Sequence, residues 1–538
     1  MKRRDFITKS TLAAAGTASL LAASCNTNSS SEKNEEKSAQ ESSDNFELNE
    51  ITVVALQEKL KSGQYTSEKI VQLYLDRINK IDKAGPSINA VIETNPDALG
   101  IARSADEERK NGKVRGPLHG IPVLIKDNID TADKMKTSAG SLALASSIAL
   151  KDSFVAQKLR EAGAIILGKT NLSEWANIRS SHSTSGWSGR GGLTKNPYVL
   201  DRNACGSSSG TGAAIAANLA TIGIGTETDG SVVCPSSHNA LVGIKPTLGL
   251  IPSKGIIPIA HSQDTAGPMC RCVADAAALL FALADTSKNG QFEFVPDYTK
   301  SLDPNGLKGM RIGVARKYFG FNNDVDKLMN DSIAVMKQQG ATIVDPADIP
   351  HTGEYDATEL DVLLYELKAD LNTYLAGLGP NASMKTLKDI IDFNEKNKDK
   401  ELKYFGQDLF IKAQEKGPLT TKEYLEALEK NHRLSQKEGI DAIMDKEKLD
   451  AIIAPTGGPA WTTDLINGDH FAGGYSTPSA VAGYPHITVP SGFVYGLPVG
   501  LSIFGRAWNE ATLIKIAYAY EQATKHRKSP TFLPTVKY

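Results

Sequence analysis

Apolar side chains recur along this chain at two alternating spacings, one typical of helices and one of buried strands. From Thr66 onward they return at helical intervals through Ile70 and Tyr74, and Thr66 is a suitable cap for that helix. Residues 120–126, GIPVLIK, form a nearly continuous apolar run that ends in a charge. This run predicts a buried strand with Lys126 at its exit.

The alternation of helices and strands continues to the C-terminus. We expect helices over 152–162, 212–220, 325–339 and 510–524, and strands over 87–93, 164–168, 450–455, 486–490 and 500–505. Residues from about 357 to 445 are rich in Lys, Glu and Leu at helical spacing, which predicts a helical segment beside the sheet. Because no internal linker or repeat divides the pattern, it favours one large α/β domain over residues 49–538.

Residues 1–25 have a different pattern, in which basic residues precede an apolar stretch. Lys2, Arg3 and Arg4 come before the small apolar stretch at 12–23, an order typical of a twin-arginine export signal. A retained transmembrane helix is the alternative, but the stretch is shorter than the roughly 20 residues that a bilayer requires. We therefore expect a signal peptide over residues 1–25 and export of the protein.

The segment LLAASC, which ends at Cys25, resembles the cleavage box of bacterial lipoproteins, whose cysteine receives a lipid. Ala22 stands where Leu is usual, so cleavage by an ordinary signal peptidase stays open. Residues 26–48 are almost entirely polar and predict a flexible tether. We expect a periplasmic protein, or a lipoprotein of a bacterial envelope that is attached to the membrane through a lipid on Cys25.

Composition and charge narrow the class of protein. The chain has 538 residues, of which 41% are hydrophobic and 23% charged, enough apolar material for a large folded core. Its 60 basic and 62 acidic residues leave a net charge of -2. A protein that binds nucleic acid usually carries a basic excess to neutralise phosphates. We therefore expect no nucleic-acid partner.

The cysteines leave disulfide formation open. They stand at positions 25, 205, 234, 270 and 272, so four belong to the folded part if Cys25 carries a lipid. Cys270 and Cys272 have the spacing of half a metal site, but no second cysteine pair or histidine cluster completes a set of zinc ligands. We expect thiols there, and neither a metal nor an organic cofactor.

Two small-residue segments are candidates for catalysis. CGSSSGTG at 205–212 precedes an alanine-rich helix, and by itself it is also compatible with a flexible loop. GTETDGS at 225–231 turns through Gly230 to present Ser231. Consecutive backbone N–H groups in such a turn can stabilise the oxyanion that forms when a hydroxyl attacks an amide, although Ser231 is also compatible with a helix cap.

A nucleophilic serine needs a base. None of the nine histidines lies in a nucleophile motif such as GxSxG. Lys126 is the better candidate, because desolvation at the end of a buried strand lowers the pKa of a lysine from about 10.4 toward neutrality. A solvated lysine at the end of a strand is the alternative for this residue alone.

Taken together, these segments resemble the amidase signature family from about residue 50 to the C-terminus. GIPVLIKDNIDT holds the lysine of the family at Lys126, and CGSSSGTGAAIAA and GTETDGS hold its two serines at Ser207 and Ser231. The C-terminal segment from AGYPHITVPSGF onward also resembles that family. The resemblance implies the family fold, a large and mostly mixed β-sheet sandwiched between helices.

The resemblance also implies a mechanism. Lys126 would be the base, Ser207 the relay and Ser231 the nucleophile that forms an acyl-enzyme, with an oxyanion hole made by the backbone N–H groups of Thr228, Asp229, Gly230 and Ser231. In the family the relay serine follows a cis peptide bond, which here would join Gly206 to Ser207. The reaction is hydrolysis of a linear carboxamide C–N bond.

Departures from the commonest family pattern narrow the expected substrate. Cys205 and Ser209 stand where many relatives have glycine, and TDGS replaces the more usual TGGS at Asp229. These features, with SQDTAGP at 262–268 and YELKADLNTYL at 365–375, look most like bacterial peptide amidases, which remove the C-terminal amide of peptides. We therefore expect a small amide or an amidated peptide as the substrate.

Alternative functions remain for this sequence. The amide-cleaving subunit of the tRNA-dependent amidotransferase shares the triad, but it works in the cytoplasm, which conflicts with an export signal. A hydrolase of fatty acid amides or aryl acylamides is compatible with the motifs, because the segment at 357–445 can form various pocket walls. A surface lipoprotein without catalysis is disfavoured by the intact Lys126, Ser207 and Ser231.

Overall fold

The structure is a computed structural model that describes residues 45–285, 297–380 and 382–538. The chain divides into two units, Met1–Asn49 and Glu50–Tyr538. The predicted signal peptide at 1–25 lies outside the described residues, as does the predicted tether as far as residue 44. The second unit holds all the candidate catalytic residues.

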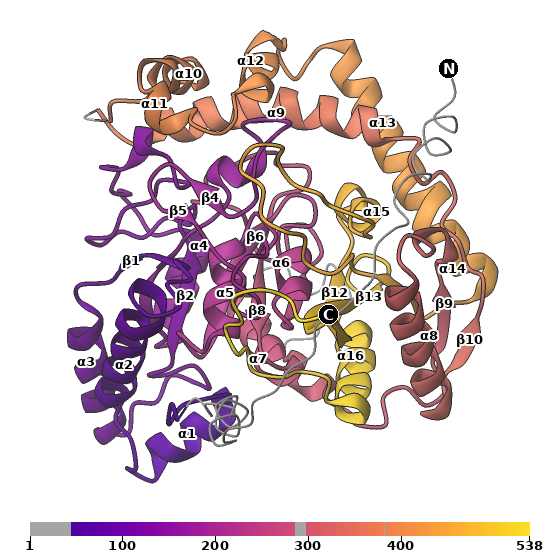
Figure 1. The fold of residues 1–538 in the computed structure, drawn as a ribbon, viewed down its shortest axis with the longest axis horizontal. Helices are drawn as coiled ribbons and strands as arrows, with labels where there is room; N and C mark the ends of the chain where they lie inside the picture. The colour runs from indigo at the N-terminus through magenta and orange to yellow at the C-terminus, as the bar shows by residue number, and fades with distance from the viewer. Residues whose placement is uncertain (1–44, 286–296, 381) are drawn as a thin grey trace, which may run out of the picture. The chain divides into compact units, whose positions relative to one another are not determined.

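A sheet of 11 strands runs through the second unit in the order β1-β3-β2-β6-β8-β7-β12-β13-β11-β9-β10 (Figure 1). The strands are β1 (Val91–Thr94), β2 (Pro122–Lys126), β3 (Ile165–Thr170), β6 (Ile222–Glu227), β7 (Val242–Lys245), β8 (Thr265–Cys270), β9 (Arg311–Val314), β10 (Thr342–Val344), β11 (Ala451–Pro455), β12 (His486–Val494) and β13 (Leu497–Phe504). A separate ribbon pairs β4 (Trp187–Ser188) with β5 (Gly192–Leu193).

The large sheet is mixed. β2 pairs in parallel with β3 and β6, and β9 pairs in parallel with β10 and β11, whereas β6, β8, β7, β12, β13 and β11 pair in antiparallel order. Every residue of β2, β3, β6, β7, β8, β11 and β13 is buried. Since alternate side chains of a strand point to opposite faces, both faces of the central sheet are covered, and the predicted fold class is confirmed.

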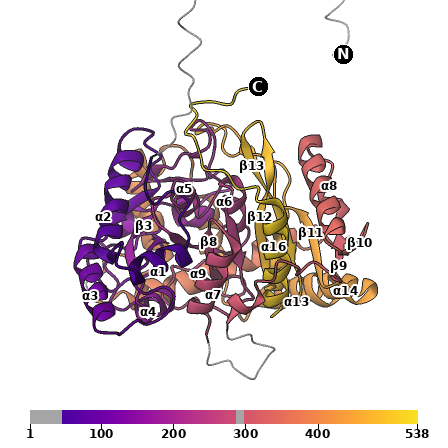
Figure 2. The ribbon, with the colours of Figure 1, turned by 90° about the horizontal axis from the view of Figure 1, so that it is seen from below.

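Helices cover this sheet and extend past its edges. They are α1 (Val53–Lys61), α2 (Ser67–Arg77), α3 (Ala98–Lys110), α4 (Phe154–Glu161), α5 (Ser209–Ala216), α6 (Val233–His238), α7 (Val273–Leu283), α8 (Asn323–Gln338), α15 (Thr477–Ala482) and α16 (Glu510–Thr524). Figure 2 shows α2 and α3 beside β3 at one end of the sheet and α8 beside β9 and β10 at the other. In the described chain, no helix combines the length and apolar character needed to cross a bilayer.

Residues predicted to be helical between 357 and 445 form α9 (Asp356–Gly377), α10 (Leu387–Lys396), α11 (Lys398–Glu401), α12 (Asp408–Glu415), α13 (Lys422–Ser435) and α14 (Asp441–Glu447). α9 packs against α12 and α13, and Figure 1 shows these helices along one side of the unit. The buried face of α9 presents Leu364, Leu367 and Leu371 to a core that includes Trp175 and Phe410. The segment therefore shares an apolar core with the loop after β3.

Sequence patterns located most elements to within a few residues, with two clear exceptions. The strand expected over 87–93 begins only at Val91, because Ser87 and Asn89 have positive φ angles of 52° and 55° and turn the chain there. The helix expected over 212–220 spans Ser209–Ala216. It ends early because Asn218 takes a positive φ of 59°.

Candidate active site

β2 carries Lys126 at its C-terminal end, where the strand lies between β3 and β6. The side chain is fully buried. Its Nζ lies 2.7 Å from Ser207 Oγ, 2.9 Å from Thr226 Oγ1 and 3.2 Å from the carbonyl oxygen of Thr226. The lysine at the exit of the strand is thus in hydrogen-bond contact with the first candidate serine, 81 residues further along the chain.

Burial determines the protonation of this lysine. It lowers the pKa of Lys126 from 10.5 to about 7, because the ammonium form loses its hydration in the interior. Negative charges on Asp264 and Glu227 raise the pKa and offset only part of that effect. The hydroxyls and the carbonyl in contact with the amine are neutral. A substantial fraction of neutral amine, which can accept a proton, is therefore present near pH 7.

Ser207 lies in the segment that leads into α5, and the peptide bond between Gly206 and Ser207 is cis, as the resemblance implied. The space before this bond is crowded. A Cβ on Gly206 would lie 2.2 Å from Ser173 Oγ and 3.1 Å from Ser185 Oγ, well inside normal contact. Close packing of two neighbouring serines thus explains the glycine of the CGSSSG motif.

Ser208 connects this segment to β6 and to the second candidate serine. Its hydroxyl donates to the carbonyl of Thr226 at 3.1 Å, and its backbone N–H donates to the carbonyl of Ser231 at 3.2 Å. The Ser207 and Ser231 hydroxyls form no hydrogen bond with each other among the described contacts. Ser231 is buried, with 8% of its surface exposed. The hydrogen bond from Ser208 places the segments that carry the two serines next to each other.

The turn after β6 is shaped by a buried carboxylate. Glu227 Oε2 accepts hydrogen bonds from the backbone N–H groups of Val232 at 2.7 Å and Val233 at 3.1 Å, which closes the loop 228–231. Gly230 in this loop has a φ of +76°, a conformation that favours glycine. The chain therefore turns sharply at the residue before Ser231, as the sequence predicted.

The loop leaves a row of donors available. Among contacts within the described chain, the backbone N–H groups of Thr228, Asp229, Gly230 and Ser231 donate no hydrogen bond. Buried backbone N–H groups in proteins are nearly always paired, so unpaired neighbours in one turn are unusual. Such a row is suited to stabilising a negatively charged oxygen beside Ser231.

Side chains outside the motifs hold this loop from two sides. On one side, Thr228 Oγ1 donates to Asp264 Oδ1 at 2.6 Å, and Asp264 Oδ2 accepts from the N–H groups of Ile259 and Ala260 at 2.8 and 2.9 Å. Burial raises the pKa of Asp264 to about 6, and its hydrogen bonds counteract that rise. Gln263 Nε2 donates to the carbonyl of Thr228 at 3.3 Å.

On the other side, Asp229 is held between α15 and α9. Thr477 Oγ1 donates to Asp229 Oδ2 at 2.6 Å. Glu359 of α9 is close enough to Asp229 for the two carboxyls to influence each other electrostatically, and Gln263 Nε2 donates to Glu359 Oε1 at 3.0 Å. Burial raises the pKa of Glu359 well above its usual range, and the charge of Asp229 raises it further. Ionisation of Glu359 beside Asp229 is therefore disfavoured.

Sequence reasoning did not identify Asp264, Glu359 or Thr477 as parts of the site. Asp264 lies in the SQDTAGP segment, where only the resemblance to peptide amidases draws attention to it. Glu359 lies within a long amphipathic helix, where an acidic residue carries no local signal of a catalytic neighbour. These contacts span 36, 96 and 248 residues, and no spacing in the sequence predicts them.

A disulfide that the sequence left open joins Cys205 to Cys234. Cys205 precedes the cis peptide bond, and Cys234 lies in α6, just after Ser231. Cys270 and Cys272 are free thiols. Burial raises the pKa of both thiols well above the usual range, so neither is activated as a nucleophile.

Two groups of side chains in the described residues have the spacing of metal ligands. One is Cys205, Cys234 and His238, whose two sulfurs are bonded to each other here. The other is His261, Glu366 and Asp370, where His261 Nδ1 is already 2.8 Å from Asp370 Oδ2. Neither group includes the cysteines at 270 and 272, whose spacing is that of half a metal site.

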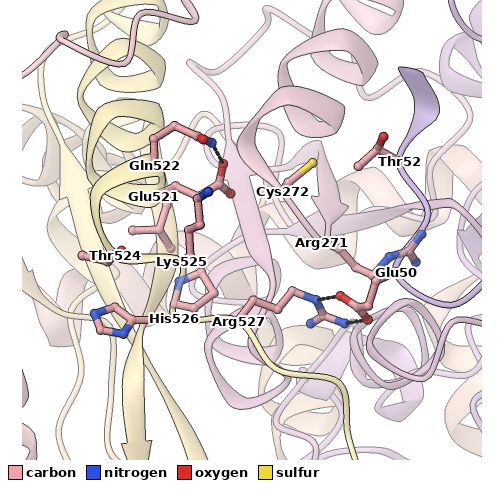
Figure 3. Close-up of a pocket in the computed structure, with 12 residues that line it drawn as sticks. Glu50, Thr52, Arg271, Cys272, Glu521, Gln522, Thr524, Lys525, His526 and Arg527 are labelled. Atoms are coloured by element: carbon pink, nitrogen blue, oxygen red, sulfur yellow. Dashed lines mark hydrogen bonds and ion pairs between the residues drawn. The ribbon is translucent and has the colours of Figure 1, made fainter. Parts of the chain in front are cut away.

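A pocket of about 250 Å³ lies between the C-terminal end of α16 and the start of α7 (Figure 3). Arg527 donates to both carboxylate oxygens of Glu50 at 2.7 and 2.8 Å, and Glu521 accepts from the N–H of Val273 at 2.8 Å. These charged groups are therefore paired within the protein. The residues that line the pocket include none of the candidate catalytic residues, which are located elsewhere in the unit.

Comparisons with known proteins identify the family of this chain. A family described as Amidase matches residues 69–514. A probable amidase of Arabidopsis thaliana is 40% identical over 506 residues, which cover 91% of this chain and 93% of that protein. A glutamyl-tRNA(Gln) amidotransferase subunit of Thermoanaerobacter pseudethanolicus is 35% identical over 502 residues, which cover 90% of this chain and 99% of that protein.

A solved structure extends the likeness to the whole fold. The peptide amidase of Stenotrophomonas maltophilia is 47% identical, with a TM-score of 0.85, and the match covers 90% of this chain and 99% of that chain. A peptide amidase in complex with the competitive inhibitor chymostatin superposes with a TM-score of 0.87 at the same identity. The chain therefore belongs to the amidase signature family and is an amide-hydrolysing enzyme.

Proposed function

We propose that this enzyme removes the C-terminal amide of peptides, with Ser231 as nucleophile, Ser207 as relay and Lys126 as base. The observation that carries the mechanism is the 2.7 Å contact between the buried Lys126 amine and the Ser207 hydroxyl. The hydrogen bond from the backbone N–H of Ser208 to the carbonyl of Ser231 keeps Ser231 next to the segment that carries Ser207. A base next to a relay, and a relay next to a nucleophile, is the arrangement that covalent catalysis requires.

In the first step, neutral Lys126 accepts the proton of Ser207 while Ser207 accepts that of Ser231. Ser231 Oγ attacks the amide carbon, and the carbonyl oxygen becomes an oxyanion near the free N–H groups of residues 228–231. Removing one such donor in other hydrolases costs roughly 3 to 4 kcal/mol of transition-state stabilisation. The Ser231 hydroxyl would have to form a hydrogen bond to Ser207 during the reaction, and catalytic contacts commonly tighten when substrate binds.

Collapse of the tetrahedral intermediate breaks the C–N bond. Ser207 returns a proton to the nitrogen, which leaves as ammonia when the substrate is a primary amide. The acyl group remains on Ser231 as an ester. Water then attacks the ester, with the same lysine and relay serine removing its proton, and releases the carboxylic acid.

The proposed substrate class rests on similarity to a known peptide amidase. The solved peptide amidase of Stenotrophomonas maltophilia is 47% identical over nearly its whole length. The departures at Cys205, Ser209 and Asp229 are the features that indicated this subgroup from the sequence. We therefore place amidated peptides ahead of fatty acid amides and aryl acylamides. An assay with one amide of each class, at equal concentration, separates these substrates by kcat/KM.

Labelling with a fluorophosphonate, followed by peptide mass mapping, tests the mechanism. We expect the label on Ser231, and we expect Ser231→Ala to lose both the label and about 10³-fold or more of kcat. Ser207→Ala should lose a comparable factor, and the double variant little more, because the two serines act as one unit. Ser104→Ala, at an exposed position of α3, is the matched control. Label on another serine, or full turnover by Ser231→Ala, would refute the assignment.

Export and lipid attachment belong to the proposal on sequence grounds alone. We propose that residues 1–25 are removed during export and that Cys25 then carries a lipid, which holds the enzyme at a bacterial membrane. Mass spectrometry of the mature N-terminus tests this. A mature chain that begins at Cys25 with the mass of a diacylglyceryl group is expected, and an intact Met1 would contradict export.

A further inference from the structure

The disulfide between Cys205 and Cys234 joins the two segments that carry the candidate serines. Cys205 lies two residues before Ser207, and Cys234 lies three residues after Ser231. The Cα atoms of the two cysteines are 6.0 Å apart. A chain of two or three residues spans at most about 7 or 11 Å, so both candidate serines lie close to the disulfide.

A second connection lies on the other side of Ser207. The backbone N–H of Ser208 donates to the carbonyl of Ser231 at 3.2 Å. The disulfide, this hydrogen bond and the chain segments 205–208 and 231–234 together form a closed ring, which we call the serine ring. Ser207 lies within the serine ring, and Ser231 is one of its corners. Without the disulfide, this hydrogen bond and Asn239 would still connect the segments, because Asn239 Nδ2 donates to the carbonyls of Ala204 at 3.0 Å and Pro235 at 2.7 Å.

Each cysteine is also fixed to its own segment. The N–H of Cys205 donates to Asn203 Oδ1 at 2.7 Å, and its carbonyl accepts from Ser209 Oγ at 2.5 Å. The N–H of Cys234 donates to the carbonyl of Gly230 at 2.8 Å, which links it to the residue before Ser231. A displacement of either sulfur is therefore transmitted to a catalytic segment.

The surroundings of the disulfide are apolar and closed. Cys205 and Cys234 retain 4% and 8% exposure, and the indole of Trp461 completes a small cluster with them. His238, one helical turn after Cys234, packs edge-on against Trp461 with ring centroids 5.2 Å apart. His238 Nδ1 also lies 3.2 Å from the carbonyl oxygen of Cys234, within the same helix. The disulfide is therefore the covalent connection between the two segments.

We infer that the Cys205–Cys234 disulfide is a positioning element of the active site, so that reduction of this bond slows amide hydrolysis. This inference rests on the proposed function, because it assigns the cysteines no chemistry of their own and acts through Ser207 and Ser231. A proton relay through two hydroxyls depends on their separation, and a displacement of about 1 Å can lower a rate by about 100-fold. Disulfides persist outside the cytoplasm, which agrees with the expected export of the enzyme.

Reversal of the bond is ordinary thiol–disulfide exchange. The thiolate of a low-molecular-weight thiol attacks one sulfur and forms a mixed disulfide, which releases the other cysteine as a thiolate. A second thiol then attacks the mixed disulfide, so two thiols are oxidised to one disulfide and the protein gains two electrons and two protons. Cys205 and Cys234 are left as separate thiols.

Two pairs of variants test the inference in the full enzyme. In Cys205→Ser/Cys234→Ser we expect kcat per folded molecule to fall by about tenfold to a hundredfold, with KM changed less than about twofold. The rate of fluorophosphonate labelling of Ser231 should fall by the same factor as kcat. The control is Cys270→Ser/Cys272→Ser, which removes the two free thiols and should leave kcat within about twofold of the parent.

Single variants and a redox cycle sharpen the result. Cys205→Ser and Cys234→Ser alone should each lower kcat as much as the double variant, because breaking either end opens the same ring. For the parent, incubation with dithiothreitol should lower kcat and reoxidation should restore it, while the double variant should respond to neither treatment. If a variant fails to fold, reduction and reoxidation of the parent still test whether kcat depends on the disulfide.

A double variant that melts earlier but keeps a kcat within about twofold of the parent would overturn the inference, since the disulfide would then only stabilise the fold. Equal losses in both cysteine pairs would overturn it as well. These outcomes differ from failure of the proposed function. Full turnover by Ser231→Ala refutes the mechanism itself, whereas an inactive Ser231→Ala with unaffected cysteine variants refutes only the positioning role.

Discussion

The amine of Lys126 lies 2.7 Å from the hydroxyl of Ser207 in a fully buried site where its contacts are two hydroxyls and a carbonyl. A lysine in contact with a carboxylate would remain an ammonium group, which donates hydrogen bonds and has no lone pair to accept a proton. Here burial lowers the pKa of Lys126 by more than the negative charges of Asp264 and Glu227 raise it, and the pKa falls to about 7. The contact is therefore one in which the nitrogen can accept a proton.

The first prediction concerns the pH dependence of catalysis. In the proposed mechanism neutral Lys126 is the base, so kcat/KM should rise about tenfold for each pH unit below about 7 and level off above it. Lys126→Ala should lower kcat/KM by about 10³-fold or more above pH 7 and remove that rise. The measurement is kcat/KM from pH 5 to 9 with one amide. A parent profile that is flat across pH 7 would contradict the role of Lys126.

The second prediction concerns stability. The folded pKa of Lys126 lies below its unfolded value, so the unfolded chain binds more protons between about pH 7 and 10.5. Stability therefore rises with pH in that window, and the penalty for burying the lysine is complete below about pH 7. Lys126→Met removes the penalty, and we expect it to raise the free energy of unfolding by about 1 to 3 kcal/mol at pH 7. The gain should shrink toward pH 10.

Urea denaturation of Lys126→Met and of the parent, at pH 7 and pH 9.5, measures this difference. Thr226 Oγ1 keeps a donor in the variant, because Asn128 Nδ2 lies 2.9 Å from it, so the substitution orphans few polar atoms. Lys110→Met, at an exposed position of α3, is the control for a change of surface charge. A variant that is less stable at pH 7, with equal differences at both pH values, would contradict the prediction.

The third prediction concerns the carboxyl pair beside the loop 228–231. Burial raises the pKa of Glu359 well above its usual range, and the neighbouring Asp229 also disfavours its ionised form. As the pH rises through that pKa, Glu359 ionises against Asp229 and repulsion displaces the loop. Glu359→Gln keeps a neutral donor in the same place. We expect the variant to retain kcat within about threefold at pH 7.

The same variant should keep its activity at alkaline pH, where the parent loses it. The measurement is kcat from pH 7 to 10, with circular dichroism to exclude unfolding. Asp229→Asn is the matched change on the other carboxyl, and it should also remove the alkaline loss because no charge pair can form. If the parent and both variants declined together at alkaline pH, the carboxyl pair would not be the cause.

The course of the chain was predictable where each element has its own local pattern. GIPVLIK located β2 and Lys126 at its end, and the segment at 510–524 coincided with α16. The turn at Gly230 followed from its glycine and short polar neighbours. The patterns could not predict the distances between Lys126, Ser207 and Ser231. The order of these residues along the chain is compatible with many arrangements, and only the family resemblance placed them in one site.

The supporting contacts could not be predicted, because they depend on tertiary packing. Asp264, the residue before β8, is hydrogen-bonded to Thr228, and Glu359 acts on Asp229 electrostatically from a helix on a different part of the chain. Five cysteines permit several pairings, and only the fold selects Cys205 with Cys234. The strand expected over 87–93 begins only at Val91 for a related reason. The positive φ angles of the preceding polar residues cannot be predicted from hydrophobic alternation.

The last prediction concerns the crowded glycine before Ser207. Gly206→Ala places a methyl group 2.2 Å from Ser173 Oγ, so Ser173 or the Gly206 segment must move. We expect a loss of about 1 to 3 kcal/mol in the free energy of unfolding and a fall in kcat of about tenfold or more. Ser173→Gly removes the clashing side chain, and the double variant should recover more stability than the sum of the single changes predicts. Urea denaturation and kcat for the four proteins of this cycle measure the coupling, and strictly additive effects would show that the crowding has no energetic consequence.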